Sequence, residues 1–387
     1  MRTKLGDVCA SIYDGDHNAP PKSGSGIPFI TISNIDANDG FIDFSDTAFV
    51  PEEYYKSLKG ERKPKRGDVL YSVVGSFGIP SLLKDDKRFV FQRHIAILRP
   101  SEKLDSTYLY YLLKDSSFYH WADAVAIGSA QRTVTLGQLR SKEVNLPDLE
   151  TQRRIAAVLS AYDELIENSR KQIKLLEEAA QRLYKEWLID LKFPGHETTP
   201  IVDGLPEGWR KVKLVDIADV QYGFAFKADQ FNSDGNGLPI IRIRNVADGF
   251  SQDYTTEKTD EKYLVYDGDT IVGMDGDFYI NSWSGGVAYL VQRSCRIKAR
   301  DDRLDAYLRW AITAPIRAFQ HGIVGSTVSH LGKRHIDSIE VLIPSYGMVD
   351  LFSSMRNQIV NLRKQIAAAR EARNRLLLKL MSGEIKV

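Results

Sequence analysis

The pattern of apolar and polar positions divides the chain into two kinds of segment. Short runs rich in Val, Ile, Tyr and Phe, separated by Gly-Asp and Gly-Pro signals, predict strands joined by turns. One helix is expected to interrupt these strands, around 106–115 in the first half and around 305–314 in the second. A generic strand-rich domain without a recognisable site is the alternative interpretation of these segments.

The second kind of segment is a long helix at 148–191, which contains no Pro and no Gly. Its apolar positions recur at steps of four and three, the a/d seam of a coiled coil. The seam runs through Ile155, Leu159, Tyr162, Ile166, Ser169, Ile173, Leu176, Ala180, Leu183 and Trp187. Asp148, directly after Pro147, is the predicted N-cap. About 40 residues at 1.5 Å per residue give a rod of roughly 60 Å.

A second helix of the same kind is predicted at 345–383, with Gly383 as its C-terminal stop. Its seam runs through Phe352, Met355, Ile359, Leu362, Ile366, Ala369, Arg373, Leu376 and Leu380. Only Ser169 and Arg373 interrupt the two seams. Two rods of similar length in one chain are expected to form an antiparallel pair. The alternative is that each rod packs on its own globular part, but a stripe this narrow favours the pair.

Several landmarks occur twice, in the same order and roughly 200 residues apart. GIPFITISNID at Gly26 corresponds to GLPIIRIRNVADG at Gly237, and KRGDVLYSVVGSFG at Lys65 corresponds to YDGDTIVGMDGDF at Tyr266. This order predicts a duplication: two mixed α/β domains separated by two long antiparallel helices. The expected boundaries are a first domain at 1–147, a first helix at 148–191, a linker at 192–208, a second domain at 209–344 and a second helix at 345–383.

Composition adds mainly exclusions. The 387 residues are 43% hydrophobic and 27% charged, which excludes a disordered chain. No apolar run of about 18 residues predicts a membrane span, and the first residues lack the apolar core of a secretory signal. With two cysteines, Cys9 and Cys295, a cytoplasmic location is expected. The net charge of +1 gives no global sign of nucleic-acid binding, so such a sign must be local.

The sequence contains no recognisable catalytic motif. The chain lacks the Asn/Asp-Pro-Pro-aromatic turn of an amino-methyltransferase, a P-loop, a nucleophile elbow and His spacing for zinc. The sequence therefore predicts a chain that is not an enzyme by itself and holds no metal or cofactor.

Recognition of double-stranded DNA is the remaining interpretation, because two similar domains on a rigid spacer could contact two separated places on a regular polymer. Polar loops at matching places carry Arg, Gln and Asn, which make bidentate contacts to base edges. The residues in these loops differ between the repeats although the framework is shared. Such divergence is expected if each repeat recognises a different DNA sequence; neutral drift of solvent-exposed loops is the alternative explanation. The candidate DNA-binding residues are Thr31, Ser33, Asn34, Ser76, Phe77, Arg93, His94, Ser129, Gln131, Arg132, Arg242, Arg244, Asn245, Asp275, Asp277, Arg293, Ser326, Thr327 and Lys333.

Together the duplicated GxPxIxxxN, GDxL/I and Gln-Arg landmarks, LETQRRIAAVLSAYDELIE and LPEGWRKVKLVDIADVQYGFAFKADQF resemble the specificity subunit of type I restriction-modification systems over essentially the whole chain. The first repeat departs from the pattern, since it lacks counterparts of LPEGW and of GFAFK. The resemblance implies two target recognition domains, a bipartite target, and helices that act as a ruler and docking surface. It also implies two methyltransferase subunits that use S-adenosylmethionine on adenine N6, and restriction subunits that use ATP and Mg²⁺.

Docking is expected near the start of each helix, at Leu149, Ile155, Leu159, Tyr162, Phe352, Met355 and Ile359. A stand-alone bipartite DNA-binding regulator or decoy, without methyltransferase partners, is the main alternative function. A structural tether without a DNA role is a third.

Overall fold

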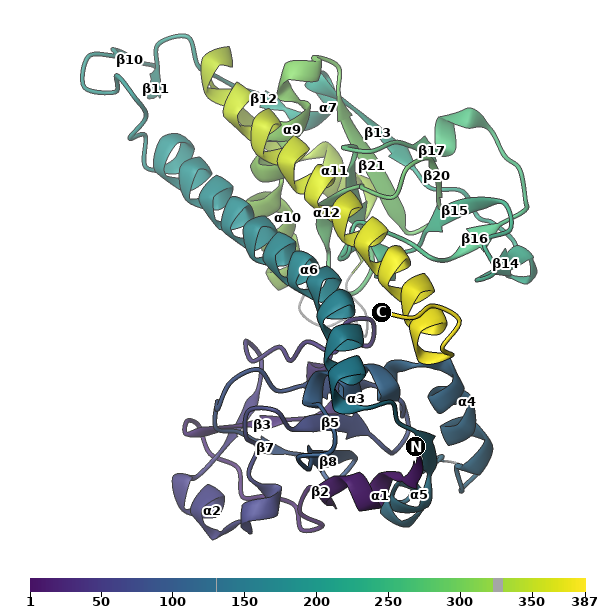
Figure 1. The fold of residues 1–387 in the computed structure, drawn as a ribbon. Coiled ribbons are helices and arrows are strands. Elements are labelled where there is room, and N and C mark those ends of the chain that lie inside the picture. The colour runs from purple at the N-terminus through teal and green to yellow at the C-terminus, as the bar shows by residue number, and fades with distance from the viewer. Residues whose placement is uncertain (130, 323–329) are drawn as a thin grey trace. The chain divides into compact units, whose positions relative to one another are not determined.

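A computed structural model describes residues 1–129, 131–322 and 330–387. The chain forms two compact units (Figure 1). Unit 1 consists of Met1–Leu165 and Ala369–Val387, and unit 2 consists of Ile166–Ala368. Both boundaries fall inside the long helices, so each unit contains a part of each helix. The domain boundaries expected from the sequence stay a prediction.

Unit 1 is built on three sheets. A four-stranded antiparallel sheet has the order β2-β8-β5-β6, a three-stranded sheet has the order β4-β3-β7 with β3 and β7 parallel, and β1 pairs with β9. The strands are β1 (Arg2–Lys4), β2 (Cys9–Asp14), β3 (Ile27–Ile30), β4 (Ala48–Val50), β5 (Val69–Ser72), β6 (Pro80–Leu82), β7 (Val90–Phe91), β8 (Ile95–Pro100) and β9 (Glu143–Asn145).

Unit 2 repeats this topology. Its four-stranded antiparallel sheet has the order β13-β21-β18-β19, its five-stranded sheet contains the parallel pair β15–β20, and β12 pairs with β22. The strands are β12 (Arg210–Lys213), β13 (Ala218–Tyr222), β14 (Phe231–Asn232), β15 (Leu238–Ile241), β16 (Tyr254–Thr255), β17 (Leu264–Val265), β18 (Thr270–Gly273), β19 (Ile280–Ser282), β20 (Ala288–Leu290), β21 (Ser294–Ala299) and β22 (Glu340–Ile343). A small hairpin, β10 (Ile201–Val202) and β11 (Leu205–Pro206), precedes them. The predicted duplication is confirmed.

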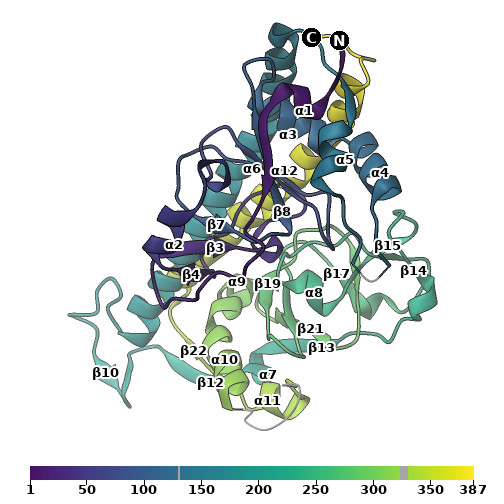
Figure 2. The same cartoon turned by 90° about the horizontal axis from the view of Figure 1, so that it is seen from below.

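Short helices cover these sheets. In unit 1, α1 lies beside α5 (Figure 2), and in both units the single expected helix is in fact two. The second helix of unit 1 begins after Asp115, whose carboxylate accepts from the Ser117 amide at 2.9 Å, so a capping residue splits the segment. The helices are α1 (Leu5–Val8), α2 (Glu52–Ser57), α3 (Ser106–Lys114), α4 (Ser116–Val125), α5 (Leu136–Ser141), α7 (Leu214–Ile217), α8 (Ile243–Val246), α9 (Asp302–Ala311), α10 (Thr313–Gly322) and α11 (Lys333–Asp337), with 3-10 turns η1 (Ile32–Asn34), η2 (Gly60–Arg62), η4 (Ala228–Gln230) and η5 (Glu261–Tyr263).

The two long helices are α6 (Leu149–Tyr184), which continues as a π-helical turn η3 (Lys185–Ile189), and α12 (Tyr346–Met381). Asp148 caps α6 as predicted, because its carboxylate accepts from the Thr151 amide at 2.8 Å. Gly383 follows the end of α12 with a φ of +76°, the left-handed conformation typical of a helix stop.

The helices are antiparallel within each unit. In unit 1, Ile155 and Leu159 of α6 share a core with Leu377 and Leu380 of α12, and further along α6 Asp163 contacts Arg373, which lies earlier in α12. In unit 2, Glu177 contacts Arg363 and Ala180 shares a core with Phe352.

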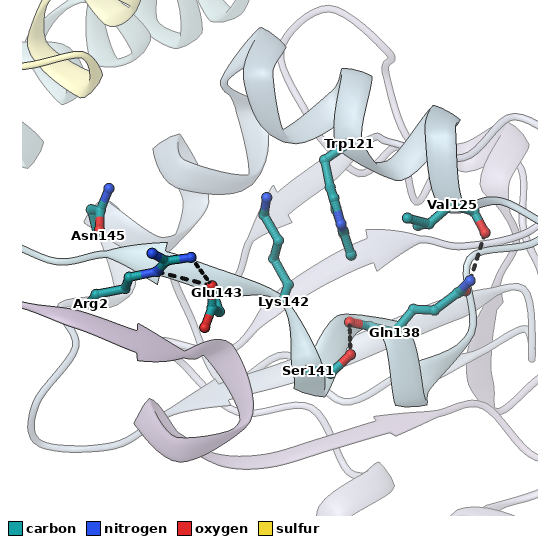
Figure 3. Close-up of a pocket in the computed structure, with 8 residues that line it drawn as sticks. All are labelled: Arg2, Trp121, Val125, Gln138, Ser141, Lys142, Glu143 and Asn145. Atoms are coloured by element: carbon teal, nitrogen blue, oxygen red, sulfur yellow. Dashed lines mark hydrogen bonds and ion pairs between the residues drawn. The ribbon is translucent and has the colours of Figure 1, made fainter.

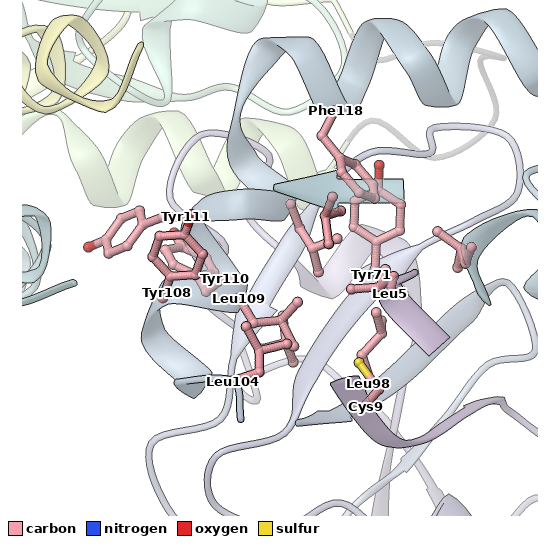
Figure 4. Packing of buried hydrophobic residues seen from close by; sticks show 14 of the residues in the cluster. Leu5, Cys9, Tyr71, Leu98, Leu104, Tyr108, Leu109, Tyr110, Tyr111 and Phe118 are labelled. Atoms are coloured by element: carbon pink, nitrogen blue, oxygen red, sulfur yellow. The ribbon is translucent and has the colours of Figure 1, made fainter. Parts of the chain in front are cut away.

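The seam is not the only packing surface of the helices. The unit 1 core also contains Tyr108 and Leu109 of α3 and Tyr71 of β5 (Figure 4), so the helix ends pack on the globular part as well as on each other. In unit 1 the long helices therefore pack both on each other and on the globular part, so the two predicted alternatives coexist. One contact explains why: the side chain of Gln152 accepts from the Asp105 amide at 2.9 Å and so ties the start of α6 to the cap of α3.

Candidate nucleic-acid interface

Four loops meet at one end of unit 1, and each contains predicted DNA-binding residues. Backbone hydrogen bonds join Gln92 N to Ile30 O at 2.9 Å, Val73 N to His94 O at 2.8 Å and Gly75 N to Arg132 O at 3.0 Å. We call residues 31–34, 73–78, 92–94, 127–129 and 131–133 the unit 1 loop end. The structure thus brings together Thr31, Ser33, Asn34, Ser76, Arg93, His94, Ser129, Gln131 and Arg132.

Unit 2 builds its loop end in the same way, from 242–245, 274–279, 292–293 and 330–333. Backbone hydrogen bonds join Val291 N to Ile241 O at 3.2 Å, Met274 N to Arg293 O at 2.9 Å and Leu331 N to Met274 O at 2.7 Å. These elements carry the predicted residues Arg242, Arg244, Asn245, Asp275, Asp277, Arg293 and Lys333. Ser326 and Thr327 lie outside the described residues.

The asparagine that ends the GxPxIxxxN landmark shapes a turn in both units. The Asn34 Oδ1 accepts from the Thr31 amide at 2.9 Å, while its Nδ2 donates to the Asp46 carbonyl at 3.0 Å. The Asn245 Oδ1 accepts from the Arg242 amide at 2.9 Å. Both ends of the Asn34 amide are therefore engaged within the protein, and the Thr31 hydroxyl donates to the same Oδ1 at 2.9 Å. The Ser33 hydroxyl lies 2.7 Å from that of Thr31, and Ser33 is exposed.

Phe77 is a core residue, which corrects its assignment as a DNA-facing side chain. It is buried, belongs to the unit 1 core and stacks on Tyr119 with 5.9 Å between ring centroids. Its neighbour Ser76 is exposed. Phe77 is predicted to face DNA because it lies in a loop that differs between the repeats, but its apolar ring has partners inside the domain instead.

Carboxylates hold several of the predicted arginines. Arg244 forms a bidentate pair with Asp253, with Nη2 to Oδ1 at 2.5 Å and Nε to Oδ2 at 3.2 Å. In unit 1, Arg132 pairs with Asp123 and its guanidinium lies 5.6 Å from the Phe77 ring centroid. These pairs preorganise the guanidinium groups in the free protein, and they lower the positive charge that the loop ends offer to phosphates.

Asp275 is one of these partners, so its predicted contact to a base is not available in this state. Arg293 Nη1 lies 2.8 Å from Asp275 Oδ2, and His330 Nδ1 lies 2.5 Å from Oδ1. Although burial acts to raise it, the pKa of Asp275 is lowered by the hydrogen bonds from His330 and Arg293. Arg293 itself is 67% exposed and has a φ of +67°, unusual for a residue with a side chain. Asp275 therefore orients the Arg293 guanidinium, while most of the Arg293 side chain remains exposed to solvent.

The remaining predicted residues have simple environments. Asp277 accepts from Gln320 Nε2 at 3.1 Å and from the Tyr279 hydroxyl at 3.1 Å. Arg93 is exposed, and burial together with the Arg93 charge lowers the pKa of His94, which favours its neutral form at pH 7. Lys333, the first residue of α11, is exposed, as are Ser129 and Gln131.

Four of the seven predicted docking residues are not surface residues. Ile155 and Leu159 lie in the unit 1 core, Phe352 lies in the unit 2 core, and Ile359 is 1% exposed. The sequence predicts docking at these seam positions, whereas the partner helix and the globular parts cover them. Leu149, Tyr162 and Met355 are half-buried. The apolar side chains left exposed nearby are Val158, Leu165 and Leu351.

A surface pocket of about 530 Å³ lies in unit 1, outside the loop end (Figure 3). Trp121 forms part of its lining, and Lys142 Nζ lies 4.9 Å from the Trp121 ring centroid. At its rim Arg2 Nε donates to Glu143 Oε2 at 2.9 Å. The pocket contains none of the predicted DNA-binding residues.

The described residues contain no group of His, Cys, Asp or Glu arranged to hold a metal ion. Cys9 and Cys295 are free and buried, and burial raises the pKa of each thiol to about 12. Neither is a thiolate near neutral pH. Within the part of the chain that the structure describes, no helix is long and apolar enough to cross a membrane.

Residues 2–178 and 206–367 each match the family described as "Type I restriction modification DNA specificity domain". The chain belongs to this family. The two matches cover both repeats, and the resemblance inferred from the sequence is confirmed.

Relatives in this family match over nearly the full chain. The type I restriction enzyme MjaIX specificity subunit of Methanocaldococcus jannaschii is 26% identical over 383 residues, covering 94% of this chain and 88% of that protein. The putative MjaX specificity subunit of the same organism is 22% identical over 406 residues, covering 99% and 93%. The crystal structure of a type I restriction-modification S subunit from M. genitalium has the same fold, with a TM-score of 0.53 and 14% identity over 98% of this chain and 95% of that one.

Sequence reasoning missed the acidic partners of the arginines and one further element of the specificity-domain repeats. Asp39-Gly40-Phe41 follows Asn34, and Asp248-Gly249-Phe250 follows Asn245. A closer alignment of the repeats would have revealed this shared string. We call each Asp-Gly pair the Asp-Gly turn of its unit.

Proposed function

We propose that this chain is the non-catalytic subunit that gives a type I restriction-modification enzyme its DNA specificity, by reading a bipartite double-stranded target. One loop end contacts each half of the target. The observation that carries this proposal is that both loop ends share one hydrogen-bonded framework while their exposed side chains differ. A duplicated scaffold with different side chains at matching places is suited to two different short sequences.

The geometry supports base reading more than strong phosphate binding. Several guanidinium groups are oriented by carboxylates, as Arg244 is by Asp253 and Arg293 by Asp275. Oriented arginines suit bidentate contacts to guanine, whereas a chain with a net charge of +1 has little charge for a long phosphate track. The partner subunits would supply the additional phosphate contacts.

The test is selection of bound duplexes from random DNA by the full chain, alone and with its methyltransferase partner. We expect two short specified elements separated by an unspecified spacer of fixed length. A single uninterrupted element, or no enrichment, would refute bipartite reading and would favour the tether.

We further propose that catalysis belongs to partners: two methyltransferase subunits that use S-adenosylmethionine, and restriction subunits that use ATP and Mg²⁺. Recruitment would use the exposed apolar side chains Val158 and Leu165, one heptad apart on α6, and Leu351 on α12. Val158→Asp should reduce co-purification with the methyltransferase subunit more than tenfold, because it places a charge in an apolar contact.

Leu175→Asp is the matched control, since Leu175 is an exposed leucine of the same helix outside the proposed docking stretch. Equal recovery of the methyltransferase subunit by both variants would contradict the proposal that Val158 and Leu165 form its docking surface. A wild-type chain that never recovers a methyltransferase would instead support the regulator or decoy.

A further inference from the structure

Each Asp-Gly turn is pressed against a strand of its own unit. Gly40 has a φ of +70°, and a Cβ built on it would lie 2.2 Å from the Pro80 carbonyl oxygen at β6. Gly249 has a φ of +65°, and a Cβ on it would lie 2.7 Å from the Ser282 carbonyl oxygen at β19. Only glycine fits both the backbone conformation and the close approach. The position of each turn is therefore narrowly defined.

Each turn is also joined to the asparagine-capped turn at the loop end. In unit 1, Gly40 N donates to Asp36 O and Asp43 N donates to Asn34 O, both at 2.8 Å. In unit 2, Gly249 N donates directly to Asn245 O at 3.0 Å. A displacement of the Asp-Gly turn would therefore displace the segment that carries Thr31 and Ser33, or Arg242 and Arg244.

Arginines of α12 contact the turn of unit 1. Arg373 Nη1 lies 3.1 Å from Asp39 Oδ1, and Arg370 Nε donates to Asp39 Oδ2 at 2.9 Å. The side chains of Arg373 and Asp39 are 1% and 0% exposed. Arg373 also pairs with Asp163 of α6, whose other carboxylate oxygen accepts from the Tyr111 hydroxyl at 2.6 Å. A buried charge network thus connects the turn to both long helices.

An arginine of the same helix contacts the turn of unit 2. Arg363 Nη1 donates to the Ser282 carbonyl at 2.9 Å, and a Cβ on Gly249 would lie 2.6 Å from this nitrogen. Arg363 Nη2 donates to Glu177 Oε1 of α6 at 3.2 Å, and Arg309 donates to the same oxygen at 3.0 Å. Burial and the Arg309 charge lower the pKa of Arg363 to about 10, so the guanidinium remains charged at neutral pH.

One helix therefore contacts the Asp-Gly turns of both units through residues within 363–373. We propose that Arg363, Arg370 and Arg373 are positioning residues that fix both loop ends to α12 and thereby fix the separation at which the two half-targets are read. This inference rests on the proposed bipartite reading. It adds that spacer selectivity depends on three side chains as well as on helix length.

The alternative is that these arginines only stabilise the fold, and a readout of spacer selectivity separates the two. The experiment uses the full chain and duplexes that carry the two half-targets found by selection, with spacers one and two base pairs shorter and longer. The variants are Arg363→Gln, Arg370→Gln and Arg373→Met, each checked for folding. The control is Arg375→Gln, an α12 arginine that is 77% exposed and pairs with Glu371 of the same helix.

We expect the variants to lose at least about threefold of the preference for the optimal spacer, while the base preference within each half-target stays unchanged. Arg375→Gln should keep the wild-type profile. Arg373→Met removes a buried charge and carries a risk of misfolding, whereas Arg363→Gln leaves Glu177 paired with Arg309 and Arg370→Gln leaves Asp39 paired with Arg373.

Folded variants that keep the wild-type spacer profile would overturn the inference and leave bipartite reading intact. If the wild-type chain bound duplexes of every spacer length equally well, the idea that the long helices set the spacer length would be overturned. A bipartite preference that is lost together with base preference would show a folding role only.

Discussion

The two units share a topology but differ in how they hold their Asp-Gly turns to α12. Unit 1 uses a dry network in which Asp39 and Asp163 face Arg373, all nearly inaccessible to solvent. Unit 2 uses Arg363 on a backbone carbonyl and on Glu177, a carboxylate that is 34% exposed. The two repeats therefore share a backbone framework, but different ion pairs and hydrogen bonds join their Asp-Gly turns to α12. This difference also explains why a seam that should be apolar contains Arg373.

The largest expected difference between the units is in stability. Arg373→Met should destabilise unit 1 by about 3–5 kcal/mol, because the Asp163 carboxylate would stay buried without its cationic partner. Arg363→Met should cost about 1–2 kcal/mol, since Glu177 keeps Arg309 and is partly solvated. Denaturant unfolding combined with hydrogen exchange of each unit measures both. Equal losses would show that burial does not distinguish the two networks.

A second comparison concerns the loops after β5 and β18, which place Phe77 in the unit 1 core and Phe278 in the unit 2 core. Because Phe77 is a core residue, Phe77→Ala should destabilise unit 1 by about 3 kcal/mol and leave the base preference of the folded fraction unchanged. Ser76→Ala on the exposed side of the same turn is the control and should leave stability unchanged. A loss of DNA binding without a loss of stability would restore Phe77 as a DNA-facing residue.

The loop ends should act independently on the two halves of the target. Arg293→Ala should cost about 1–3 kcal/mol of binding and relax preference only in the half-target read by unit 2. Arg93→Ala, in the corresponding loop of unit 1, should relax only the other half. Binding to duplexes substituted at single positions measures both effects. Relaxation of both halves by either variant would contradict the assignment of one half-target to one unit.

A further expected difference appears at alkaline pH. Burial and the Arg373 charge lower the pKa of Lys114 to about 8, whereas the matching place in unit 2 is Thr313. An unfolded chain, with an ordinary lysine pKa near 10.4, binds a proton that the folded chain releases above pH 8. The stability of wild type relative to Lys114→Met should therefore rise between about pH 8 and 10 and stay flat below pH 8. Paired denaturant unfolding curves test this; a flat difference across the range would contradict the lowered pKa.

Local and periodic signals made much of the fold predictable. The seam of alternating steps located both long helices, and Pro147-Asp148 and Gly383 located two of their ends. The repeat located the shared framework and the loops that meet at each loop end. Tertiary contacts determine the side-chain environments that the sequence did not predict. Phe77 is buried in the core, and Asp253 and Asp275 pair with arginines. No spacing in a sequence reveals such pairs, because the partners are brought together only when the strands are paired.

The division of α12 between the units affects how the protein can form during synthesis. Residues 166–368 are continuous in the chain, so unit 2 can assemble as they leave the ribosome. Unit 1 has to wait, because Leu377, Leu380 and the arginines that meet Asp39 and Asp163 are translated after unit 2. A nascent chain that stops before Ala369 would hold the globular part of unit 1 without these partners. Unit 1 is therefore completed only after residues 369–387 have been made, although most of it is translated before unit 2.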